Sequence, residues 1–170
     1  MKLITIQHKN VLDQLLSGNK YVATRKVENF LQSAYNTLKK EYNYENNPVF
    51  ACPINRYCEF MGASTEDTYL IELDVPDEFI KLQNYYEWSD LIYFSESPED
   101  WDSNIADLEN FIKDTLNGNR TEDKDEIIQA TIPYIEPSWV ISYHELTKKF
   151  IKKHIGSGGN NILKEIENYI

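Results

Sequence analysis

The sequence contains few of the residues that build metal centres or disulfide frameworks. Its 170 residues include only two cysteines, Cys52 and Cys58, and three histidines, and the cysteines do not form a CxxC pair. Zinc sites made of Cys and His need closely spaced ligand sets, which are missing here. We therefore expect no metal and no cofactor. Two interpretations of the cysteines stay open: a redox pair, or two ordinary thiols buried in a reducing cytosol.

Long apolar runs and the common catalytic signatures are missing as well. No run is long enough to span a bilayer, and the apolar stretch near the N-terminus is too short for the core of a signal peptide. These two observations predict a cytoplasmic protein that does not contact membranes. The sequence has no GxxxxGK[ST], GxGxxG, HExxH or GxSxG motif, so it indicates no catalytic residue.

Basic residues are nearly absent from the middle of the chain. From Glu59 to Glu109 there are fifteen Asp or Glu and one basic residue, Lys81, whereas the rest holds thirteen acidic and sixteen basic residues. The net charge of −11 is therefore concentrated in this segment. Because such a segment repels phosphate groups, we do not expect nucleic acid as a partner. It is either a solvated face that aids solubility or a surface that meets a basic protein.

The order of the predicted elements favours an α+β fold. Alternating or β-branched apolar stretches predict strands over 2–7, 21–24, 49–52, 68–75, 79–82, 127–135 and 139–143. Helical spacing of apolar residues predicts helices over 11–16, 27–42, 85–94, 99–116, 146–155 and 162–170. Gly18 stands where the C-cap of the first of these helices belongs. Strands and helices do not alternate regularly, and no stretch is rich enough in Pro, Gly or Ser to link two domains. We predict a single domain over 1–170, with a mixed or antiparallel sheet of five to six strands, flanking helices and a helical extension over 144–170.

The strongest strand pattern lies over residues 68–75. Both of its faces carry apolar side chains, so we expect an interior strand with Tyr69, Ile71 and Leu73 on one face. Glu72 and Asp74 then share the other face, where they would be exposed to solvent or would bind a cation.

Several short blocks occur in the order found in a known bacterial family. They are Ile4–Gln7, Val11–Leu12, Gly18, Tyr21, Ala34–Tyr35, Pro48–Ala51, Leu70–Asp77, Trp88, Gln129–Thr131 and Trp139–Val140. Over residues 3 to about 143, the chain in this way resembles the family catalogued as domain of unknown function 3841. It departs at 48–52, where the family carries Trp residues. The resemblance implies a one-domain bacterial or phage protein and brings no established reaction.

A second, shorter resemblance concerns Gly18, Lys20 and Arg25, whose spacing is similar to the GxKxxExR motif of the ASCH domain. That resemblance implies a PUA-like barrel that binds RNA or a nucleoside through a Lys and an Arg. Ala23 stands where the motif has its Glu, so an acidic side chain of that site is missing.

The layout also resembles that of ADP-ribosyltransferase-like domains. This analogy implies a nucleotide-like ligand held in a cleft. The candidate ligand-binding residues are Gln7, Lys20, Tyr21, Arg25 and Gln129. Gln129 stands where those enzymes have an acidic residue, and an amide cannot supply the charge that stabilises an oxocarbenium-like transition state. We therefore expect the protein to bind a nucleotide-like ligand without catalysing ADP-ribosyl transfer.

The alternative function is that of an acidic inhibitor, such as an anti-defence protein or a nucleic-acid mimic, that docks a basic partner. Its candidate contact residues are Glu96, Glu99, Asp100 and Asp102, which cluster around a predicted helix start. Acidic residues also stabilise a helix N-terminus, so this cluster has a structural explanation too. The sequence does not indicate an oligomeric state.

Overall fold

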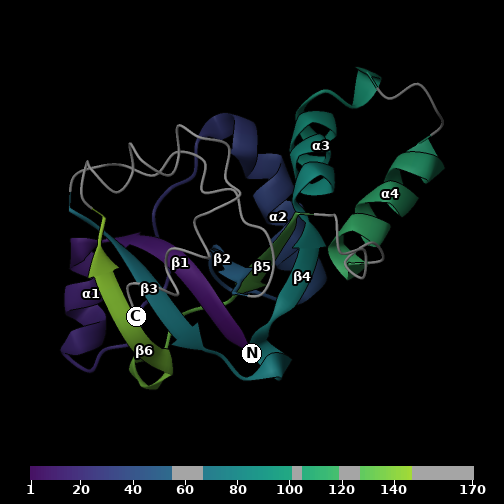
Figure 1. The fold of residues 1–170 in the computed structure, drawn as a ribbon. Coiled ribbons are helices and arrows are strands. Elements are labelled where there is room, and N and C mark those ends of the chain that lie inside the picture. Colours follow the sequence, from purple (N-terminus) through teal and green to yellow (C-terminus); the bar gives the residue numbers. More distant parts are fainter. Residues whose placement is uncertain (55–66, 101–104, 119–126, 147–170) are drawn as a thin grey trace.

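The computed structural model describes residues 1–54, 67–100, 105–118 and 127–146, and these form one antiparallel sheet with helices on both faces (Figure 1). The strands are β1 (Lys2–His8), β2 (Val49–Pro53), β3 (Thr68–Asp74), β4 (Lys81–Asn84), β5 (Ile128–Ile132) and β6 (Val140–Glu145). The α-helices are α1 (Lys9–Leu16), α2 (Gln32–Tyr42), α3 (Tyr85–Glu96) and α4 (Ile105–Asn117). Short 3-10 turns are η1 (Asn29–Leu31), η2 (Asp77–Phe79), η3 (Pro98–Asp100) and η4 (Pro137–Trp139). The predicted α+β class is confirmed.

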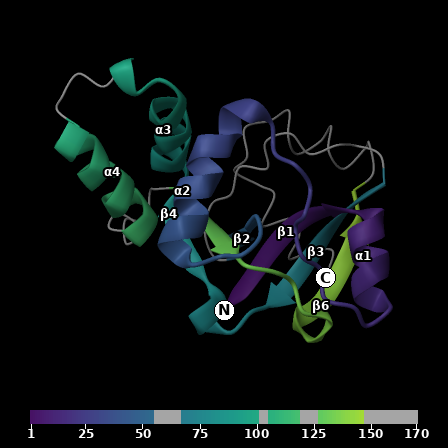
Figure 2. The same ribbon diagram turned by 180° about the vertical axis from the view of Figure 1, so that it is seen from behind.

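The six strands lie in the order β4-β5-β2-β1-β3-β6, and every neighbouring pair is antiparallel. Strand β3 lies between β1 and β6, so the predicted interior strand is confirmed. Strands β4 and β6 are the two edges of the sheet. The three larger helices gather near the β4 edge, and α1 lies near the β6 end (Figures 1 and 2).

One face of the sheet packs against α1. Its buried cluster contains Val11, Leu12 and Leu15 of α1 together with apolar side chains from four strands. Those strand residues are Leu3, Val49, Ala51, Ile71, Leu73, Ala130 and Ile132, with Tyr69, Leu82 and Val140 packed against them. Helix α1 ends at Leu16 with Ser17 as its C-cap residue, and Gly18 follows with a φ of +85°. The predicted helix end at Gly18 is thus confirmed, because this left-handed conformation favours glycine.

The other face packs against α2, α3 and α4. A second buried cluster joins Ala34 and Leu38 of α2, Trp88 and Leu91 of α3, and Leu116 of α4. Phe50 of β2 packs against this cluster from the sheet. Alternation along β2 explains the division, since Val49 and Ala51 face α1 whereas Phe50 faces the three larger helices.

Some predicted boundaries are wrong. Residues 21–24 form two isolated bridges, Tyr21 with Ile135 and Ala23 with Asn47, rather than a strand. The helix predicted over 27–42 begins only at Gln32, after η1. The helix predicted over 99–116 is divided between η3 and α4. The helices predicted over 146–155 and 162–170 lie outside the described residues, apart from Leu146.

Cys52 is buried and disulfide-bonded, so the interpretation of two ordinary thiols is wrong. The one other cysteine in the sequence, Cys58, lies outside the described residues.

Within the described residues, no helix has the length and apolar character needed to cross a bilayer.

Candidate functional site

Gln7 and Gln129 lie on opposite faces of the sheet. Gln7 alternates with Leu3 and therefore points to the α1 face, where its Nε2 donates to Thr5 Oγ1 at 2.9 Å. Ala130 belongs to the same α1-side cluster, so its neighbour Gln129 points to the opposite face. These two amides therefore do not meet in one cleft.

The remaining ligand-binding candidates follow α1. Lys20 Nζ lies 3.3 Å from Glu136 Oε1 and 4.0 Å from the centroid of the Tyr134 ring. Tyr21 is half-buried, and burial raises the pKa of its hydroxyl while nearby Arg25 opposes the shift. Lys20 and Arg25 are both exposed, as an RNA-binding interpretation requires. The charge of Lys20, however, is already balanced by Glu136.

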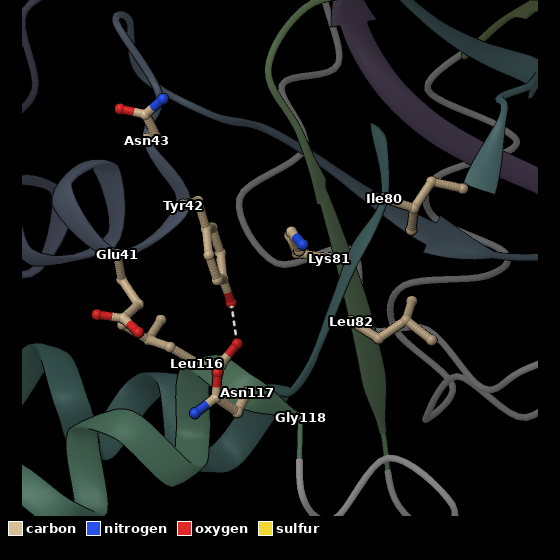
Figure 3. A pocket seen from close by; sticks show the side chains of 9 residues that line it. All are labelled: Glu41, Tyr42, Asn43, Ile80, Lys81, Leu82, Leu116, Asn117 and Gly118. Carbon is tan, nitrogen blue, oxygen red and sulfur yellow. Dashed lines mark hydrogen bonds between the residues drawn. The ribbon is translucent and has the colours of Figure 1, made fainter. Parts of the chain in front are cut away.

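A cavity of about 360 Å³ lies elsewhere, at the free edge of β4 (Figure 3). The ends of α2 and α4 and the start of β4 surround it. Its lining residues are Glu41, Tyr42, Asn43, Ile80, Lys81, Leu82, Leu116, Asn117 and Gly118. None of the ligand-binding candidates is among these lining residues. The sequence offered one signal for this site, namely Lys81 as the single basic residue of the acidic segment.

Gln129 belongs to a chain of hydrogen bonds beside this cavity. Its Nε2 donates to Gln83 Oε1 at 2.9 Å, and Gln83 Nε2 donates to the Tyr42 hydroxyl at 2.8 Å. The Tyr42 hydroxyl in turn donates to the backbone carbonyl of Leu116 at 2.5 Å (Figure 3). Burial raises the pKa of Tyr42 well above its ordinary value, against the opposing bond from Gln83. Gln129 therefore holds β5, β4, α2 and α4 together instead of facing a ligand.

The partner-binding candidates lie on the surface formed by α3, η3 and α4. We define the acidic helical surface by five exposed carboxylates: Asp90, Glu96, Glu99, Asp100 and Glu109. In the part of the chain that the structure describes, none of these five forms an ion pair with a Lys or Arg. The surface lies at the end of the molecule remote from β6 (Figures 1 and 2). Asp102, the fourth candidate, lies outside the described residues.

Helix α3 presents this surface because its two sides differ in character. Asn84 caps the helix, since its side-chain oxygen accepts hydrogen bonds from the backbone N–H groups of Tyr86 and Glu87 at 2.9 and 3.2 Å. Trp88 and Leu91 anchor the buried side in the second cluster. The opposite side is thereby held toward solvent.

Two exposed tyrosines accompany the carboxylates on α3. Tyr86 and Tyr93 are 54% and 53% exposed, and their seven-residue spacing places them on one side of the helix with Asp90 between them. The Tyr93 hydroxyl donates to the Asp100 carboxylate, and this bond raises the pKa of Tyr93. Sequence reasoning missed the two tyrosines, although their helical spacing from Asp90 was a usable signal.

Glu72 does not form a cation site with Asp74. Its side chain is buried, with Lys2 Nζ at 3.4 Å and the Ser142 hydroxyl donating to it at 3.1 Å. Asp74 is exposed and lies 3.7 Å from the N-terminal amine of Met1. Solvent exposure is therefore the wrong expectation for Glu72. Within the described residues, no three His, Cys, Asp or Glu side chains gather closely enough to hold a metal ion.

Comparison with known protein families, curated proteins and solved structures finds no match to this chain. The site must therefore be interpreted from its own geometry.

Proposed function

We propose that this protein is a protein-binding domain that docks a basic partner through the acidic helical surface. The observation that carries the proposal is the combination of five exposed carboxylates, which have no cationic partner among the described residues, with exposed Tyr86 and Tyr93. A rigid base supports them, because α3 is capped by Asn84 and packed through Trp88.

The chemistry of this surface suits arginine and lysine. Clustered carboxylates attract a basic surface over several ångströms and raise the association rate, an effect that weakens as salt increases. Tyrosine is enriched among the residues that dominate binding energies, and its ring face attracts a guanidinium group. A basic nucleic-acid enzyme is a partner class with such a surface, and an anti-defence protein would act by covering it.

The nucleotide-ligand alternative has less support. It needs Gln7 and Gln129 in one cleft, but they point to opposite faces, and the Gln129 amide is engaged with Gln83. The resemblance to domain of unknown function 3841 stays a prediction, and it implies no reaction that would favour a ligand site.

The test compares two triple variants of equal charge change. The docking variant combines Glu96→Gln, Glu99→Gln and Asp100→Asn. The control combines Glu28→Gln, Glu45→Gln and Glu78→Gln, which are exposed positions outside the surface. Binding to a fluorescent arginine-rich peptide is followed by anisotropy at low and high salt.

We expect the docking variant to bind about 10-fold or more weakly at low salt, whereas the control binds nearly as well as the parent. The difference should shrink at high salt because the charges are exposed. Equal losses in the two variants would show that only net charge matters, and the docking surface would be rejected.

A further inference from the structure

The cavity beside β4 is lined by two opposite charges that do not pair. The Lys81 ammonium and the Glu41 carboxylate both border the 360 Å³ space, with the Tyr42 side chain between them in Figure 3. Among the residues that the structure describes, neither charged group has an ion pair or hydrogen bond, and Lys81 Nζ lies 6.0 Å from the centroid of the Tyr42 ring. The two groups are also more than ion-pairing distance apart. A ligand that carries one negative and one positive charge would form an ion pair with each of these groups.

The negatively charged group of such a ligand would bind to Lys81 and to a backbone N–H at the free edge of β4. The Tyr85 N–H donates to the Ile127 carbonyl at 2.9 Å, which fixes the residues of β4 whose backbone groups face β5. By alternation, the N–H and C=O of Leu82 point away from β5 toward the free edge. Leu82 lines the cavity, so a backbone donor lies next to the Lys81 side chain.

The positively charged group of the ligand would bind to Glu41, which lies near the C-terminal ends of two helices. Helix α2 ends at Tyr42 with Asn43 as its C-cap residue, at a φ of +56°, and α4 ends just before Gly118, which has a φ of +69°. Both ends border the cavity, and helix C-termini carry partial negative charge. At the end of α4, the carbonyls of Thr115 and Leu116 already accept hydrogen bonds from the Gly118 N–H and the Tyr42 hydroxyl. Helix α4 has no basic residue in its last turn to offset this partial charge, whereas α2 has Lys39 and Lys40 there.

We propose that this cavity binds a small zwitterion of the α-amino-acid type. Its carboxylate lies at Lys81 and the Leu82 N–H, and its ammonium lies at Glu41, beside the C-terminal end of α4. The Tyr42 ring and Leu116 supply apolar walls for the ligand side chain. Natural ligand sites have volumes of about 300–1,000 Å³, and this cavity falls within that range. The site is separate from the acidic helical surface and does not depend on the docking proposal.

The experiment titrates the full chain with the standard L-amino acids and follows backbone amide shifts by NMR, with isothermal calorimetry for any hit. At least one amino acid should bind saturably, with shifts at Lys81, Leu82 and Gly118. Its N-acetyl and its C-amide derivatives each lack one charge, and each should bind about 10- to 100-fold more weakly.

Two variants and two controls assign the site. Lys81→Gln and Glu41→Gln should each weaken binding about 10-fold or more. Lys113→Gln and Glu45→Gln make the same changes at exposed positions outside the cavity lining and should leave binding unchanged. Absence of binding by every amino acid at about 10 mM would overturn the proposal. So would a hit that ignores both cavity variants or that binds its singly charged derivatives equally well.

Discussion

Replacement of Gln129 by Ala tests whether this amide is structural or free to meet a ligand. The Gln129 side chain donates to Gln83 Oε1 at 2.9 Å, and Gln83 has no solvent exposure. After truncation, the Gln83 oxygen is left buried without that donor. An unsatisfied buried acceptor costs about 1–3 kcal/mol, so the free energy of unfolding should fall by that amount.

The assay is urea denaturation followed by circular dichroism, with Gln7→Ala as the matched control. Gln7 is half-buried near the end of β1 and donates to the Thr5 hydroxyl. Because the Thr5 hydroxyl keeps its own hydrogen bond to the Phe50 carbonyl, loss of the half-buried Gln7 amide should cost about 0.5 kcal/mol or less. The m-value should stay constant in both variants, which would show that stability alone has changed.

A double-mutant cycle isolates the bond itself. Gln129→Met leaves Gln83 Oε1 without its donor. Gln83→Met leaves Gln129 Nε2 without its acceptor and also removes the bond to the Tyr42 hydroxyl, and the double variant removes both amides. We expect a coupling free energy of about 0.5–3 kcal/mol. If Gln129→Ala costs under about 0.5 kcal/mol and the coupling is near zero, the amide is not held by Gln83. The structural assignment would then be refuted, and the ligand-binding interpretation would regain its central residue.

Three further predictions concern stability. Leu73→Ala removes a fully buried side chain of β3 and should lower the free energy of unfolding in urea by about 2–5 kcal/mol. The control Leu16→Ala, at a position 56% exposed, should cost under about 0.5 kcal/mol, and equal costs would place β3 at the periphery. Burial raises the pKa of Tyr44 from 10.0 to about 12, so its contribution to the free energy of unfolding is present in full below pH 10 and is lost as the pH rises toward 12. Tyr44→Phe should flatten this decline of stability at alkaline pH, and an unchanged decline would contradict the burial argument. A Cβ at Gly18 would meet no atom within 4 Å, so Gly18→Ala should cost only the strain of a left-handed backbone, about 1–2 kcal/mol. A stabilised variant would show that the left-handed conformation at this helix end is not needed.

Local pattern alone predicted the elements that carry a clear periodicity. The alternation over 68–75 specified an interior strand because both of its faces are apolar, and β3 confirms it. Gly18 marked the end of α1 because a left-handed residue there requires little more than the absence of a side chain. The exposure of Glu96, Glu99 and Asp100 followed from charge, since unpaired carboxylates are costly to bury.

The tertiary structure alone decided the assignment of polar side chains to sites. The sequence could not reveal that Gln7 and Gln129 point to opposite faces, because the face of each residue depends on a strand register set by distant partners. Glu72 was expected in solvent, yet it is buried by contacts with Lys2 and with Ser142, seventy residues away along the chain. Lys81 was visible in the sequence as the one cation of an acidic segment. Only the packing of α4 against β4 and the bond from Gln83 to Tyr42 of α2 place Glu41 across a cavity from it. Periodicity is a local property of a chain, whereas the convergence of polar groups depends on contacts between segments that the sequence does not pair.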